Sequence, residues 1–157
     1  MRSLLRHLAG SLEEVVGLDD ASGFISYVGQ QIGDELDEVY RQKMSLSQLS
    51  RKDVAAVLVD LKQRIQGDFY IVSEDEETIV LGTHSCPFSD KVIGRPSLCM
   101  MTSNVFGTIT ASNLGYAKVV LNETIANGYQ GCLVTIYLQQ TITSDNEEGN
   151  EYFRGMP

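Results

Sequence analysis

The feature that most constrains the fold of this chain is a long stretch, from Pro96 to Ala117, without a single charged side chain. Its apolar residues recur at the three- and four-residue spacing of a helix: Leu98, Met101, Val105 and Ile109. Pro96 and Ser97 are typical of a helix start, and Gly115 is typical of a helix end. Because a helix with no charged face is buried all round, we predict that this one lies largely inside the core.

Three further helices are expected before this stretch. The apolar spacing places the first at residues 3–16 and the second at about 19–42. Ser50 and Asp53 resemble a capping box that opens the third helix, and Gly67 ends it. The part of the chain before the first strand is therefore expected to be helical.

The second helix carries a pair of glycines. Gly29 and Gly33 form a G-x-x-x-G pattern on or beside its apolar face. Glycine costs up to about 1 kcal/mol in a helix interior, so a close approach of another backbone or of a ligand is expected in compensation. We favour tight packing over a ligand cavity as the explanation.

Strands are expected on both sides of the uncharged helix. The runs FYIVSED and ETIVLGT are β-branched and aromatic with an acidic turn between them, which predicts a hairpin. After the helix, YAKVVLN predicts a third strand and CLVTIYLQQTIT a long final one. The predicted fold class is α+β, with N-terminal helices, the hairpin, the buried helix and two further strands. The economical arrangement is an antiparallel sheet with helices packed on one side.

Composition limits the domain count and the function classes. At 157 residues and 43% hydrophobic content the chain can bury one core. We expect an amphipathic helix at 1–17, one folded domain at 18–143 and a flexible acidic tail at 144–157. A net charge of -9 with scattered basic residues argues against binding to nucleic acid or to an anionic membrane. No apolar run is long enough to span a bilayer, and the N-terminal residues lack the apolar centre of a secretory signal.

The main candidates for a functional site are the three cysteines of the chain, Cys86, Cys99 and Cys132. They fall in the loop after the hairpin, in the first turn of the buried helix and at the start of the last strand, so their sulfurs can converge at one end of the core. Thiolates suit zinc, ferrous iron and iron–sulfur clusters, and the helix N-terminus is expected to lower the pKa of Cys99. A closed tetrahedral site needs a fourth ligand, for which there are three local candidates: His84, Asp90 and Glu123.

The residues alone leave other interpretations of the cysteines open. Buried cysteines often serve as small apolar packing groups. His84 and Cys86, two residues apart and beside a proline, could supply axial ligands to haem. Cys86 could also be a redox-sensing thiol. An odd number of cysteines does not make a disulfide framework, so a reducing, cytoplasmic location is expected.

Several short motifs resemble those of a known group of domains. They are CPF at Cys86, PSLC at Cys99, VFG in the buried helix, ANGYQGC at Cys132 and the glycine-bearing run GFISYVGQQIG. With these the chain resembles the vinyl-reductase-type hydrocarbon-binding domains, and most closely the methanogen output domains, over about residues 18–140.

The resemblance implies an α+β domain that tends to form homodimers and serves as a sensory or output module in bacterial and archaeal regulators. In aromatic-sensing relatives it implies zinc near the ligand pocket, held by cysteines and a glutamate, and in repressors of iron–sulfur assembly it implies a cluster. All three cysteines of this chain match family positions. Thr124 and Leu121 stand where a further cysteine and the zinc-binding glutamate would fall, so Glu123 would have to substitute.

We therefore expect a non-enzymatic sensory or regulatory domain that binds a metal centre (zinc or iron–sulfur) or a small apolar ligand, and that signals to a partner protein. The candidate cofactor and metal ligands are Cys86, Cys99, Cys132, His84 and Glu123. The uncharged helix could line a pocket for an apolar ligand. The competing enzyme class is a reductase acting on a tetrapyrrole or another apolar substrate, but the loop offers no histidine and carboxylate pair beside a nucleophile. A dimerisation or adaptor module built on the first helix is the third class.

Overall fold

A five-stranded antiparallel sheet, in the order β1-β2-β4-β3-β5, forms one layer of the structure. The computed structural model describes residues 1–155. Its strands are β1 (Tyr70–Glu74), β2 (Thr78–Thr83), β3 (Tyr116–Glu123), β4 (Cys132–Tyr137) and β5 (Asn150–Phe153). Its helices are α1 (Arg2–Val16), α2 (Leu18–Met44), α3 (Arg51–Arg64), α4 (Ser97–Leu114) and α5 (Ile142–Asp145), with 3-10 turns η1 (Ser89–Val92) and η2 (Ile125–Asn127).

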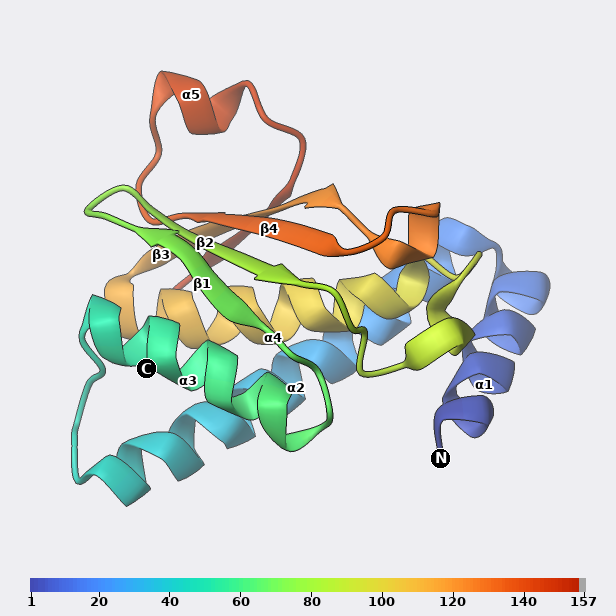
Figure 1. Ribbon diagram of the computed structural model, residues 1–157, viewed down its shortest axis with the longest axis horizontal. Helices are drawn as coiled ribbons and strands as arrows, with labels where there is room; N and C mark the ends of the chain where they lie inside the picture. The colour runs from blue at the N-terminus through green and yellow to red at the C-terminus, as the bar shows by residue number, and fades with distance from the viewer. Residues whose placement is uncertain (156–157) are drawn as a thin grey trace.

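The longer helices are stacked on one face of the sheet (Figure 1). α4 lies against the sheet with α3 beside it, and α2 packs against α4 from the side away from the sheet. α1 stands at one end, next to η1, while the short α5 lies on the opposite side of the sheet. This arrangement confirms the predicted α+β class, with an antiparallel sheet and helices on one side.

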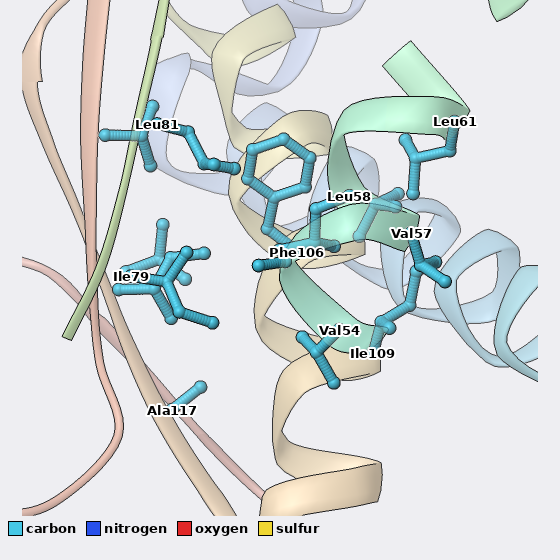
Figure 2. Close-up of a cluster of buried hydrophobic side chains, with 14 of the residues drawn as sticks. Val54, Val57, Leu58, Leu61, Ile79, Leu81, Phe106, Ile109 and Ala117 are labelled. Atoms are coloured by element: carbon cyan, nitrogen blue, oxygen red, sulfur yellow. The ribbon is translucent and has the colours of Figure 1, made fainter. Parts of the chain in front are cut away.

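The uncharged helix α4 is buried as predicted. Phe106 and Ile109 are both 0% exposed, and Figure 2 shows them among side chains of α3 and of the sheet, including Leu58 and Ile79. The ring of Phe106 meets that of Phe69 edge to face, with centroids 5.7 Å apart. Although α4 carries no charge, neither it nor any other helix in the described residues has the length and apolarity needed to cross a membrane.

Local signals in the sequence set the ends of these helices. At the start of α3, the Ser50 hydroxyl accepts a hydrogen bond from the backbone N–H of Asp53, and the Asp53 carboxylate accepts one from the N–H of Ser50 at 3.0 Å. A cap of this kind contributes about 1 kcal/mol. Gly115 ends α4 with a φ of +97°, a conformation that favours glycine. The predicted capping box and the predicted end of the buried helix are therefore both confirmed.

The C-terminal region differs from the prediction. β4 is shorter than the strand expected over 132–143, and in place of a flexible tail over 144–157 the chain forms α5 and β5. β5 pairs with β3 and so protects what would otherwise be the edge of the sheet. The ring of Tyr152 in β5 covers Gly107 of α4 and leaves no room there for a side chain. Residues 156–157 of the expected tail lie outside the described residues.

The glycine pair of α2 is explained by close helix packing, as expected. A Cβ atom placed on Gly33 would lie 2.8 Å from Cβ of Thr108, and one placed on Gly29 would lie 2.9 Å from Cβ of Asn104. Real Cβ atoms do not approach this closely, so a larger residue at either position would push α2 away from α4. The two glycines therefore set the distance between these helices.

We predict that Gly33→Ala lowers the free energy of unfolding by about 1 to 2 kcal/mol, because overpacking against Thr108 outweighs the better helix propensity of alanine. The matched control is Gly23→Ala in the same helix, where nothing lies within 4 Å of the added Cβ atom. That variant is expected to gain up to about 1 kcal/mol. Urea unfolding of both variants measures the difference, and equal effects would contradict the packing role of Gly33.

Candidate functional site

Two neighbouring hollows lie beside the loop that joins β2 to α4. The larger, which we call the apolar groove, has a volume of about 540 Å³. The smaller, which we call the cysteine cavity, has a volume of about 30 Å³. Pro87, Phe88 and Thr102 line both of them, so these three residues separate the two spaces.

The cysteine cavity brings together the three cysteines that the sequence singled out. Cys86 comes from the loop after β2, Cys99 from the first turn of α4 and Cys132 from the start of β4, and all three line the cavity. Two of the sulfurs accept a backbone hydrogen bond at 3.4 Å, Cys86 from Phe88 and Cys132 from Ile125. The volume suffices for about one water-sized body.

The three candidates for a fourth ligand do not line the cysteine cavity. His84 is exposed, and its Nε2 atom lies 3.4 Å from the hydroxyl of Tyr70. Asp90 and Glu123 are also exposed. Their places on the cavity wall are taken by side chains that are poor metal ligands, among them those of Leu121 and Thr124.

The chemistry of the thiols does not favour a resident metal in this arrangement. Within the part of the chain that the structure describes, no three His, Cys, Asp or Glu side chains form a group that could hold a metal ion. Burial raises the pKa of the Cys99 thiol to about 12 and also raises that of Cys132. The expected lowering of the Cys99 pKa at the helix N-terminus is therefore outweighed by burial, and a metal would have to displace the protons of both thiols. Metal binding at the three cysteines stays a prediction.

The functional residue that sequence reasoning missed is Lys62 of α3, which is only 4% exposed. Its Nζ atom donates a hydrogen bond to Oγ1 of Thr102 at 2.7 Å. It also lies 5.6 Å from the ring centroid of Phe69 and 5.1 Å from that of Phe106, within the range of a cation–π contact. One cation therefore occupies the boundary between the core, the cysteine cavity and the apolar groove.

Burial lowers the pKa of Lys62 to about 8, and its proximity to the three cysteines opposes this shift. No carboxylate forms a salt bridge with it among residues 1–155. A signal for this position exists in the sequence, since Lys62 follows Val54 and Leu58 at four-residue intervals on the buried side of α3. A lysine on such a stripe is normally assumed to extend its amine to water. Here the amine stays inside.

The apolar groove is enclosed by four helices and the loop after β2. Its wall is formed mostly by apolar side chains: Leu5 of α1, Ile32 and Leu36 of α2, Leu61 of α3 and Ile65 at its end, Pro87 and Phe88 of the loop, and Met101 and Val105 of α4. Its charged lining residues are the cations Lys62 and Arg64. Tyr40 also lines the groove, and its hydroxyl donates to Asp60 at 2.5 Å. Volumes of this size and an apolar wall with a few polar groups are typical of small-molecule sites.

We predict that Lys62→Met raises the free energy of unfolding at pH 7 by about 2 kcal/mol, because the cost of burying the charge exceeds the hydrogen bond that is lost. Between pH 8 and the ordinary value of 10.5 the unfolded chain holds the Lys62 proton and the folded chain does not. The free energy of unfolding of the unmodified protein therefore rises with pH across this window, and the difference in stability that favours Lys62→Met becomes smaller.

Denaturant unfolding at several pH values from 7 to 10 measures this effect. Lys52→Met is the control, because Lys52 is an exposed lysine on the same helix. It is expected to change stability by less than about 0.5 kcal/mol. A Lys62→Met protein that is less stable than the unmodified one at every pH would show that the buried ammonium is a structural contact.

The fold of the chain is shared with solved structures of low sequence identity. The phenol-responsive sensory domain of the transcription activator PoxR, solved with phenol, is similar with a TM-score of 0.72 at 15% identity, over 92% of this chain and 78% of that chain. A trafficking protein particle complex subunit 3 from Naegleria fowleri, covalently bound to palmitic acid, is similar with a TM-score of 0.61 at 14% identity, over 88% of this chain and 95% of that chain. No curated protein sequence matches the chain significantly.

A family model identifies the chain more specifically. The model of methanogen output domain 1 matches residues 4–137, which include most of α1, the three cysteines and every lining residue of the apolar groove except Met1. The match agrees with the resemblance noted in the sequence motifs. The chain therefore belongs to the methanogen output domain 1 family.

Proposed function

We propose that this domain is a non-enzymatic sensory module that binds a small apolar molecule in the apolar groove. The observation that carries the proposal is the groove itself, about 540 Å³ in volume and walled mainly by aliphatic and aromatic side chains. An apolar molecule that enters such a site removes its own surface and that of the wall from water, which stabilises the complex by about 25 cal/mol for each Å² of apolar area buried.

The structures that share this fold support a ligand-binding role. One is the sensory domain of a transcription activator in complex with phenol, and the other carries palmitic acid. An aromatic ring and an acyl chain are both apolar bodies, and both are smaller than the groove of this domain. We extend this ligand class to the present chain on the strength of its own groove.

The surroundings of the groove support a role in signalling. Leu5 of α1 and Phe88 of the loop are both part of its wall, so a ligand would contact two segments that also reach the outer surface. α1 exposes Leu4 and Val15, and α2 exposes Phe24, with exposed fractions of 55%, 81% and 59%. We propose that these exposed apolar residues take part in a homodimer or in contact with a signalling protein, and that the domain acts in the cytoplasm.

Two of the three thiols are poorly suited to nucleophilic catalysis. A cysteine nucleophile reacts as a thiolate, whereas burial raises the pKa of both Cys99 and Cys132. His84, the imidazole nearest to them in sequence, is exposed and lies beside Tyr70.

The second candidate function is a metal or redox centre at the three cysteines. It is favoured by one observation, that Cys86, Cys99 and Cys132 line the same cavity. Zinc or an iron–sulfur cluster would need deprotonated thiols and a fourth ligand from outside the cavity. Haem would need His84 to turn inward as an axial ligand. Either cofactor would make the cysteine cavity, and not the apolar groove, the sensing site.

We predict that the purified protein binds at least one of phenol, 1-decanol and decanoate with a stoichiometry of one per chain, and that Leu36→Trp weakens this binding about tenfold or more because the indole fills the groove. Ile142→Trp, an exposed substitution on α5, is the control. Isothermal titration calorimetry gives the affinities. Failure of all three compounds to bind, or equal binding by the two variants, would contradict the proposed function.

The same preparations test the second candidate if they are assayed for zinc, iron and sulfide. Metal held in stoichiometric amount and lost in Cys99→Ser and Cys132→Ser would establish the cysteine cavity as a cofactor site. Metal-free protein that still binds an apolar compound would leave the groove as the sensing site.

A further inference from the structure

We infer that the ligand of the apolar groove is an amphipathic carboxylic acid, whose carboxylate is bound by the ammonium group of Lys62 while its apolar body fills the groove. This inference rests on the proposed function and names the class of molecule that the groove accepts. It is carried by Lys62, a nearly fully buried cation that lines the groove.

Lys62 lacks a carboxylate counterion within the described part of the chain. Charged groups that are buried are normally paired, because an isolated charge inside a protein is costly. The two arginines of α3 are paired although they are less buried than Lys62: Arg51 pairs with Glu74, and Arg64 pairs with Asp60 at 2.6 Å. Lys62, the most buried cation of α3, has no carboxylate partner among the described residues. A ligand with a negative charge would supply one.

The three cysteines lie close enough to affect the charge of Lys62, Cys86 most of all, followed by Cys99 and Cys132. None of them is a carboxylate, and burial raises the pKa of Cys99 and Cys132, which disfavours their charged forms. The cysteines therefore do not give Lys62 a carboxylate partner.

The ammonium group of Lys62 can donate more hydrogen bonds than the described residues accept from it. An ammonium group carries three N–H donors, and the described residues give that of Lys62 one hydrogen bond, to Oγ1 of Thr102. Because Thr102 accepts in this bond, its own O–H is available to donate. Two kinds of donor therefore stand next to each other on the wall of the groove. A carboxylate, with two acceptor oxygens, can accept from both at once.

The charged residues that line the groove favour a ligand with a single negative charge. The lining of the groove has no acidic side chain, and its second charged residue, Arg64, is also a cation. This is notable in a protein whose net charge is -9. One enclosed ammonium balances a single negative charge, whereas a doubly charged phosphate head would leave an excess charge in an apolar space. A monoanionic carboxylate on an apolar body would supply the counterion of Lys62, accept hydrogen bonds from Lys62 and Thr102, and bring only one negative charge into the groove.

The test compares two probes with the same apolar chain, decanoate and 1-decanol, by isothermal titration calorimetry at pH 7. The unmodified protein is expected to bind decanoate at least about tenfold more tightly than 1-decanol, because only decanoate can form charge-assisted hydrogen bonds with Lys62. Lys62→Met, which keeps the length and apolar character of the side chain, is expected to lose this preference. Its affinity for decanoate should fall about tenfold or more while its affinity for 1-decanol stays within about threefold.

Lys52→Met is the matched control, because it removes an exposed lysine from the same helix and changes the net charge equally. It should retain the preference for decanoate. Equal binding of the two probes by the unmodified protein, or a preference that survives in Lys62→Met, would overturn the inference and leave the proposed function intact. If neither decanoate nor 1-decanol binds, the groove is not a site for chain-like apolar molecules. The inference would then be overturned as well.

Discussion

The structure depends on the burial of α4, a helix without a single charged side chain. The sheet covers one side of it and α2 covers the other. The second contact is possible because Gly29 and Gly33 allow the α2 backbone to approach closely. The contacting residues are far apart in the sequence: Gly29 meets Asn104 and Gly33 meets Thr108, each 75 positions further along the chain. The uncharged helix and the glycine pair are therefore compatible with each other only in this fold.

The helix that completes the core also builds the site. Cys99 at its start lines the cysteine cavity, and Met101, Thr102 and Val105 in its next turns line the groove. The core and the binding site are therefore continuous. Lys62 marks the boundary, since its amine contacts the ring of Phe106 in the core and the hydroxyl of Thr102 in the groove wall. A buried cation at such a boundary lowers stability, which is a cost that binding sites commonly carry.

Much of this arrangement follows from local sequence rules. The uncharged run predicts a buried helix, Ser50 and Asp53 predict a cap, and the spacing of three cysteines along helix, loop and strand allows them to meet. The rest depends on contacts between distant segments. The sequence around Tyr152 is polar and by itself predicts a flexible tail. It becomes the strand β5 only through pairing with β3. Lys62 could not be recognised as enclosed, because a lysine on a helix stripe can equally well extend to water. Its amine is held inside by contacts with Phe69, Thr102 and Phe106, which only the folded chain brings together.

The most direct measurement of the central claim is an NMR titration of the Lys62 side chain, observed through its Cε and Nζ signals and assigned with the Lys62→Met protein. In the absence of ligand the account requires a pKa near 8, well below the ordinary 10.5. With decanoate bound it requires this pKa to rise, because the carboxylate stabilises the charged form. A Lys62 amine that titrates at its ordinary value, or one that does not respond to saturating decanoate, would contradict the account.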